Sequence, residues 1–338
     1  MPALPSCLLE PAWDQFRALL PGRAEFDPGH PLGCHRRRIP DRVVFDHVIQ
    51  ALVHGSGYER ISSPGCSDRT IRRRVKEWAE LGISEKIHAL ALDAYDQMIG
   101  LGLSAISVDG CITKAPSGGD KAGRSPVDRG KQGLKRSVAS DACGVPLGIV
   151  SDGANRHDSP LLDPTLDAAK AQVGEMPTTV NVNLDCGYDS VKSRGLITEL
   201  GFTAEIARKG VPAPIQAGKR WVVERTHSWM NDYGKLRRCT EKSGSVVDFH
   251  LYLAAALVTL RMLIRRATSR YRWDGSAHHT PPQVIHLPVG LRPCNGSRGL
   301  TALGHATTRP PIGNCVSVAS VGQRRRGCLR DRCTTSWR

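Results

Sequence analysis

One short stretch, Leu103 to Ala115, constrains the fold of this 338-residue chain more than any other. Residues 104–108 are small, β-branched or hydroxylated, which is the composition of a strand buried on both faces of a sheet. We expect the strand to end where the apolar run ends, at Asp109 followed by Gly110. A carboxylate there is costly to bury unpaired, so it needs a cation, a proton or a metal ion. The stretch therefore predicts a central strand that leads into a polar site.

Length and composition narrow the class of protein. The chain is long enough for two domains, and its longest apolar run, Leu251 to Leu260, is too short to span a bilayer. The amino terminus lacks the basic and apolar regions of a signal peptide, so we expect a cytoplasmic protein with no membrane partner. Eleven cysteines without a C-x-x-C pair argue against a zinc site and against a disulfide framework.

The net charge points to a polyanionic partner. The formal charge is +15 and the isoelectric point is near 9.6. Residues 268–338 hold 11 arginines, no lysine and 2 acidic residues, among many Gly, Pro and Ser. We expect this tail to be disordered, and it could be translation past the original reading frame or a basic DNA-binding tail.

Residues 1–100 predict a helical DNA-binding domain. Apolar residues recur at helical spacing in residues 10–20, 40–55, 68–81 and 84–99. Ser67 is a predicted N-cap, and Ile71, Val75 and Trp78 lie on one side of the helix that follows. Its other side is basic: Arg72, Arg73, Arg74 and Lys76. This pattern favours a helix-turn-helix DNA reader, and the alternative is a helical domain whose arginines only solvate an outer face.

Residues 101–267 predict a mixed sheet with helices on its faces, an α/β fold. A basic Gly/Ser/Pro-rich loop follows the first strand and either tracks a phosphate backbone, through Arg124, Arg129 and Lys131, or is a disordered connector. The remaining predicted elements are a strand hairpin over 135–139 and 145–150, a helix over 159–173, a strand over 178–184, a helix capped by Asp189 and ending at Leu200, a strand over 202–207 and a helix over 219–236.

Three carboxylates are candidates for chemistry. Asp185 follows the second apolar strand, as Asp109 follows the first, and Glu224 lies about 200° around its helix from Val222. A Glu on that face of a helix is usually only exposed to solvent. The two strand-end aspartates make Glu224 a candidate for a site shared with them. Crowded carboxylates repel unless divalent cations neutralise them, and oxygen ligands alone favour Mg²⁺ or Mn²⁺. Two such ions would support in-line phosphoryl transfer on DNA.

Several motifs together resemble a known family. They are DRGKQGLKRSVASD, GVPLGIVSDGANRHDSPLL, NLDCGYDS and RWVVERTHSWMNDYGKLRR, and with Asp109 they resemble the DDE transposases of bacterial insertion sequences, in the family numbered five of the larger group numbered four. The resemblance implies a ribonuclease-H-like catalytic core with Asp109, Asp185 and Glu224 as metal ligands. The group's Tyr-x2-Arg-x3-Glu-x6-Lys pattern is incomplete, since Ala217 and Asn231 replace its Tyr and Lys.

The resemblance also implies a function. It implies binding of terminal inverted repeats, cleavage and strand transfer with two Mg²⁺ or Mn²⁺ ions, double-stranded DNA as end and target, and a homodimer on nucleoid DNA. Lys135 completes the predicted DNA contacts together with Arg220 and Arg225, which either hold DNA phosphates or form salt bridges with nearby acids. Two alternatives for the function stay open: a nuclease or resolvase with the same core, and a decayed DNA-binding repressor.

Two further places in the sequence are polar. His157 and Asp158 lie after a strand, near where the sheet ends should converge, and we favour a cap and loop-packing role for them over a catalytic one. For His227 we favour a solvated position over a contact with the scissile phosphate.

Overall fold

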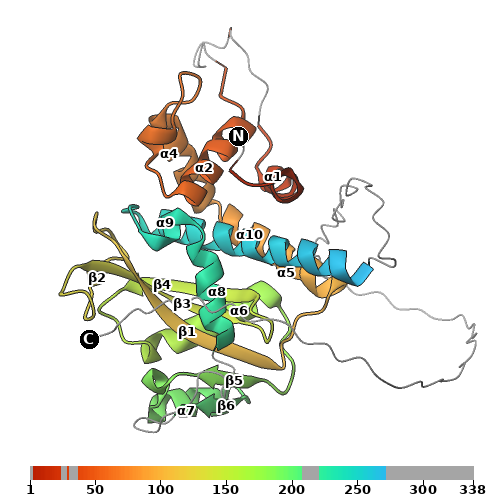
Figure 1. The fold of residues 1–338 in the computed structure, drawn as a ribbon, viewed down its shortest axis with the longest axis vertical. Coiled ribbons are helices and arrows are strands. Elements are labelled where there is room, and N and C mark those ends of the chain that lie inside the picture. The colour runs from red at the N-terminus through yellow and green to blue at the C-terminus, as the bar shows by residue number, and fades with distance from the viewer. Residues whose placement is uncertain (1–2, 24–28, 30–36, 208–220, 272–338) are drawn as a thin grey trace, which may run out of the picture. The chain divides into compact units, whose positions relative to one another are not determined.

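The computed structural model describes residues 3–23, 29, 37–207 and 221–271 (Figure 1). Arg220 and the predicted tail beyond residue 271 lie outside these ranges. The helices are α1 (Ser6–Leu19), α2 (Asp41–His54), α3 (Tyr58–Ile61), α4 (Asp68–Glu80), α5 (Ile83–Met98), α6 (Ser159–Val173), the 3-10 turn η1 (Cys186–Tyr188), α7 (Val191–Glu199), α8 (Trp221–Asn231), α9 (Gly234–Arg237) and α10 (Gly244–Tyr271). The strands are β1 (Ala105–Lys114), β2 (Gly123–Arg124), β3 (Gln132–Ser140), β4 (Pro146–Gly153), β5 (Asn181–Leu184) and β6 (Thr203–Ile206).

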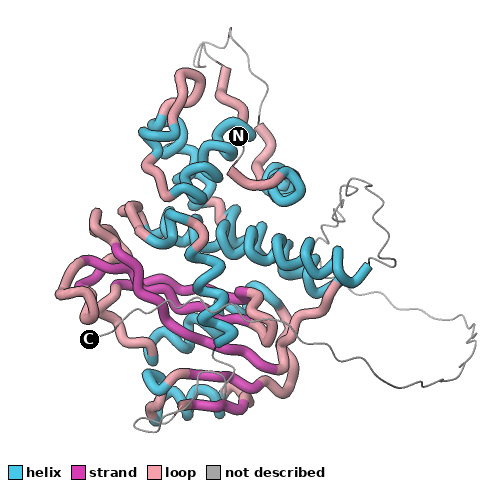
Figure 2. Tube along the Cα trace, viewed as in Figure 1, coloured by secondary structure: helices cyan, strands magenta, loops and turns pink. Residues whose placement is uncertain are grey.

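The strands form one mixed sheet, as predicted. Its order is β2-β3-β1-β5-β6, with β4 also paired to β3. Strand β3 is antiparallel to β1 and β4, whereas β5 is parallel to β1 and to β6. Figure 2 shows the strands in magenta with the helices around them in cyan. The predicted β3–β4 hairpin turns at Gly144, whose φ of 85° is one that glycine adopts without strain. The sheet thus has an antiparallel half and a parallel half that meet at β1.

Strand β1 does not end at Asp109, which corrects our prediction. It continues to Lys114 because β3 pairs with it as far as Lys114 opposite Gly133. Strand β5 pairs with it only as far as Val108 opposite Leu184. Asp109 therefore lies where β1 loses its parallel neighbour while keeping its antiparallel one. An apolar run in one segment could not reveal how far each neighbouring strand extends.

Helices cover both halves of the sheet. Helix α6 packs against β3 and β4, so closely that a Cβ on Gly148 would lie 2.3 Å from the backbone nitrogen of Ala169. Helix α8 packs against β1 and β3 and crosses in front of the sheet in Figure 1. Ile106 and Val108 of β1 are buried in the same core as Leu162 of α6. The helices thus lie against β1, β3 and β4.

The first helices form as predicted and share a core with α10. The Ser67 hydroxyl accepts a hydrogen bond from the backbone N–H of Thr70, which confirms the N-cap of α4. Ile71, Val75 and Trp78 are buried. Helix α10 packs against α5, α4 and α1, and one hydrophobic cluster joins these helices to residues of β3 and β4. The division at residue 100 into a separate domain stays a prediction.

Helix α10 is a core helix by its surroundings. Among the described residues it is the one helix long and apolar enough to cross a membrane, and 78% of its apolar window is buried in the protein. It runs from Gly244 to Tyr271.

Candidate active site

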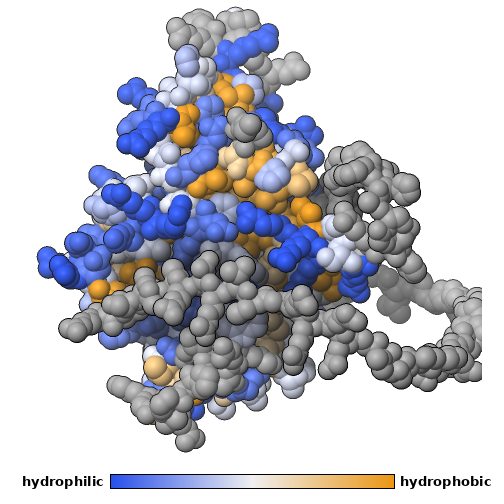
Figure 3. Space-filling model, viewed as in Figure 1, coloured by the Kyte–Doolittle hydropathy of each residue, from blue (hydrophilic) through white to orange (hydrophobic). Residues whose placement is uncertain are grey.

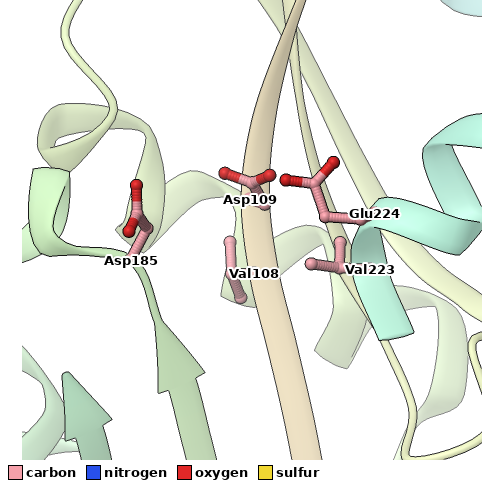
Figure 4. Close-up of a pocket in the computed structure, with 5 residues that line it drawn as sticks. All are labelled: Val108, Asp109, Asp185, Val223 and Glu224. Atoms are coloured by element: carbon pink, nitrogen blue, oxygen red, sulfur yellow. The ribbon is translucent and has the colours of Figure 1, made fainter. Parts of the chain in front are cut away.

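Three carboxylates from three elements line one pocket, together with Val108 and Val223 (Figure 4). Asp109 comes from β1, Asp185 from the turn after β5, and Glu224 from the first turn of α8. In Figure 4 the carboxylates of Asp109 and Glu224 point toward one another, and Asp185 lies on the other side of Asp109. The sequence prediction that these distant acids converge agrees with this geometry.

Asp109 is the most perturbed of the three acids. Burial raises its pKa to about 7, and the nearby charges of Glu224, Asp185 and Asp158 act in the same direction. The backbone N–H of Gly110 donates a 2.8 Å hydrogen bond to Asp109 Oδ1, which opposes this shift without cancelling it. The pocket is thus a site of concentrated negative charge that a cation would relieve.

Helix α8 is fastened to the β3–β4 hairpin, and this contact places Glu224. The Thr226 hydroxyl donates to the carbonyl oxygen of Gly144 at 2.8 Å, and Arg225 Nη2 donates to that of Cys143 at 2.8 Å. The Arg225 guanidinium also stacks between Trp221 and Trp229, 4.4 Å and 4.7 Å from their ring centroids. The predicted helix over 219–236 is divided in the structure, because α8 ends at Asn231 and α9 begins at Gly234.

A buried arginine forms a second link between the sheet and α8. Arg136 of β3 is 1% exposed, and its Nη2 donates to Asn231 Oδ1 at 2.8 Å and to the carbonyl oxygen of His227 at 3.3 Å. Asn231, which replaces the family's Lys, therefore anchors α8. His227 is 3% exposed, so our expectation of a solvated histidine is wrong; burial first and Arg136 second lower its pKa to about 3.

The donor set suits a hard divalent cation. Three carboxylates share the pocket, and carboxylate oxygens are the ligands that Mg²⁺ and Mn²⁺ prefer. As they stand, no three His, Cys, Asp or Glu side chains in the described ranges lie close enough together to hold a metal ion. The residue types nevertheless suit such an ion, and the carboxylates of Asp109 and Glu224 face one another (Figure 4).

Helix α4 presents three of its four predicted DNA contacts to solvent. Arg73 is exposed and has no ion-pair partner in the described part of the chain. Arg72 is half exposed and pairs with Glu59 at 2.8 Å, and Lys76 lies 3.8 Å from Glu80. Arg74 does not belong with them. It is fully buried, because its guanidinium pairs with Asp41 and donates to the carbonyl oxygen of Ile39 at 3.1 Å.

The predicted DNA contacts near the sheet also divide into exposed residues and residues that have partners within the protein. Arg124, Arg129 and Lys131 are exposed at the far end of β1 to β3. Lys135 is buried and Arg225 is stacked, so both already have partners within the protein. We expected Asp158 to cap a helix and pack a loop near the ends of the sheet. In the structure Asp158 directly precedes α6, makes no side-chain capping hydrogen bond and pairs with Lys135 beside the pocket, so the capping part of that prediction is wrong.

Comparisons with known proteins point in one direction. The family model described as "Transposase DDE domain" matches residues 100–260. A putative transposase for insertion sequence element IS402 from Burkholderia cepacia is 34% identical over 155 residues, 44% of this chain and 72% of that protein. A crystal structure of a pre-cleavage Mos1 transpososome is 10% identical with a TM-score of 0.26, over 76% of this chain and 85% of that one, a likeness too distant to support a structural conclusion.

Proposed function

This chain belongs to the DDE transposases of insertion sequences, and from that premise we propose that Asp109, Asp185 and Glu224 are its catalytic carboxylates. The observation that carries the proposal is their convergence on one pocket from β1, β5 and α8. The reaction is DNA cleavage followed by strand transfer at the terminal inverted repeats. Strand order and flanking helices support a ribonuclease-H-like core, and the specific family numbered five remains part of the proposal.

The same three residues would hold the divalent cations that this family uses, as two Mg²⁺ or Mn²⁺ ions. Bound there, such ions supply activation of the attacking water or 3′-hydroxyl and stabilisation of the leaving oxygen. Asp109 keeps a proton part of the time at neutral pH, because burial and Glu224 hold its pKa near 7. Its carboxyl group would lose that proton when a cation binds. Val108 and Val223 give the pocket an apolar floor that limits water.

The DNA partner is contacted by two exposed basic surfaces in this proposal. One is α4, through Arg72, Arg73 and Lys76. The other is the far end of the sheet, where Lys114 of β1 and Arg124 of β2 lie on either side of β3 and a β-bridge brings Lys114 beside Arg238. Figure 3 shows hydrophilic residues over this end. We place the enzyme in the cytoplasm as a homodimer on nucleoid DNA.

Substitution of each carboxylate tests the proposal. Asp109→Asn, Asp185→Asn and Glu224→Gln should each abolish Mg²⁺-dependent nicking of DNA that carries the element's ends, while end binding and its salt dependence stay close to wild type. Asp232→Asn is the matched control, because Asp232 is an exposed acid just after α8 and pairs only loosely with Arg261 at 3.6 Å. Nicking that survives any of the three substitutions would contradict the site assignment.

A target plasmid added to the same reaction tests strand transfer. A transposase yields products in which the end is covalently joined to the plasmid, whereas a nuclease or resolvase with the same core yields cleaved ends alone. A decayed DNA-binding repressor would bind the ends and yield neither product.

A further inference from the structure

An ion pair borders the carboxylate pocket, and the proposed chemistry makes no use of it. Lys135 lies on β3 with 7% of its side chain exposed, and its Nζ is 3.0 Å from Asp158 Oδ1. Asp158 directly precedes α6 and is 31% exposed. A buried ammonium is costly without a partner, so the pair holds the loop before α6 against the sheet.

Asp158 lies between the segments that carry two of the proposed catalytic acids. A Cβ built on Gly110 would fall 2.1 Å from Asp158 Oδ1, so this oxygen rests on the residue after Asp109. A Cβ on Gly187 would lie 3.9 Å from Asp158 Oδ2, so the other oxygen faces the turn after Asp185. Lys135 is equally close, since its Cδ would be 3.8 Å from the same Gly110 Cβ. One side chain thus spans the gap between β1 and η1.

The charges of the pair matter because the pocket beside it is strongly negative. A fourth unpaired carboxylate at this distance would increase the attraction for a divalent cation and the repulsion among the acids. An unpaired ammonium would do the opposite. Together Lys135 and Asp158 add no net charge, so among the described residues that line the pocket the charged ones are Asp109, Asp185 and Glu224.

We propose that Lys135 and Asp158 are positioning residues of the carboxylate site: Asp158 packs against the segments that carry Asp109 and Asp185, and its pairing with Lys135 keeps the charge beside the pocket balanced. This inference rests on the proposed function. It also gives Lys135 a role within the protein in place of a contact with a DNA phosphate.

The test is Mn²⁺ binding to the full-length protein without DNA, followed by the electron paramagnetic resonance signal of free Mn²⁺. Asp158→Asn leaves the ammonium uncompensated and should weaken binding by about tenfold, whereas Lys135→Met leaves the carboxylate uncompensated and should tighten it by about tenfold. The double variant should return to within about threefold of wild type, because both charges are gone. Asp232→Asn is the matched control, since Asp232 is exposed just after α8 and pairs loosely with Arg261 at 3.6 Å, and it should change affinity less than threefold.

Three outcomes would overturn the inference. If both single variants weaken Mn²⁺ binding, the pair is only structural. If Lys135→Met leaves Mn²⁺ affinity unchanged but lowers end-DNA affinity and its salt dependence, Lys135 is a phosphate contact. If neither variant changes the affinity for Mn²⁺, the charges of Lys135 and Asp158 do not act on the metal site. Should Lys135→Met fail to fold, Lys135→Gln keeps a hydrogen-bond donor to Asp158 and should shift affinity in the same direction.

The same assay separates this inference from the proposed function. Asp109→Asn should lose Mn²⁺ binding if the proposed carboxylate site is correct. If Asp109→Asn binds Mn²⁺ like wild type, the site itself is wrong. If it loses binding while the two charge variants fail to move in opposite directions, only the role of Lys135 and Asp158 is wrong.

Discussion

Asp109→Asn should stabilise the protein when no divalent metal is present. Burial and the charge of Glu224 raise the pKa of Asp109 from an ordinary 3.8 to about 7, so ionising this carboxyl group costs free energy in the folded state alone. An asparagine of the same shape removes that cost, and its side-chain oxygen still accepts the hydrogen bond from the Gly110 N–H. The substitution that abolishes catalysis is therefore expected to increase the free energy of unfolding.

The size and sign of the effect follow from the two pKa values. Because the pKa is higher in the folded state, that state binds more protons between pH 3.8 and 7, and stability falls as pH rises through this range. Each pKa unit corresponds to about 1.4 kcal/mol, so the full difference is roughly 4 kcal/mol. Relaxation of Glu224 away from Asp109 would reduce it, so we expect a gain of roughly 2–4 kcal/mol at pH 8 and almost none at pH 3.5.

Urea unfolding of the full-length protein in EDTA measures this directly, at pH 8 and at pH 3.5. Asp232→Asn, the exposed control, should stay within about 0.5 kcal/mol of wild type. Adding Mg²⁺ at pH 8 should then stabilise wild type but not Asp109→Asn, because the asparagine side chain does not replace the Asp109 carboxylate as a ligand of the ion. Equal or lower stability of Asp109→Asn in EDTA at pH 8 would refute the electrostatic account of the pocket.

Three further outcomes are expected. Gly110→Ala should lower the free energy of unfolding by about 1–3 kcal/mol in urea titrations, because its methyl group would displace the Asp158 carboxylate that pairs with buried Lys135, and it should weaken Mn²⁺ binding as Asp158→Asn does. Gly234→Ala should lower the unfolding free energy by about 3 kcal/mol or more in urea titrations, since its Cβ would lie 2.5 Å from the backbone nitrogen of Gly55; a loss below about 1 kcal/mol would contradict that close contact. Burial lowers the pKa of His88 to about 4, from 6.5 in the unfolded chain. As pH falls below 6.5, the unfolded chain therefore takes up a proton that the folded chain does not. Between pH 7 and pH 5 the free energy of unfolding of wild type should fall by roughly 2 kcal/mol more than that of His88→Gln.

Local signals predicted the elements of this fold well. The Ser67 cap, the hairpin at Gly144 and the helix over 159–173 are each determined by residues a few positions apart, and each was predicted where it occurs. One cap was wrong: Ser190, not Asp189, accepts the hydrogen bond that begins α7. Either residue type can cap a helix, so the sequence alone did not separate them.

Contacts between distant segments were harder to predict. Three arginines follow one another in α4, and only the position of Asp41 and Ile39 decides that Arg74 is the buried one. Strand β1 extends beyond Asp109 because β3 pairs with it there. The length of β3 cannot be read from the residues of β1. The two aspartates could be singled out as candidates, since an acid that follows an apolar strand is a local pattern. Glu224 lies on a helix and carries no such signal. The ion pair of Asp158 with Lys135 joins the loop before α6 to β3, which no local pattern indicates.

If α4 reads DNA ends, as we propose, the core that α10 shares with α1, α4 and α5 would limit how that recognition changes. Gly55 and Gly234 lie backbone to backbone, which ties the end of α2 to α9 with no room for a side chain. Replacing the first hundred residues by those of a relative would exchange one side of that interface and leave the other side without its partner. New end preferences would then be acquired by point substitution on exposed faces such as that of Arg73, with the helices and the sheet inherited as one unit.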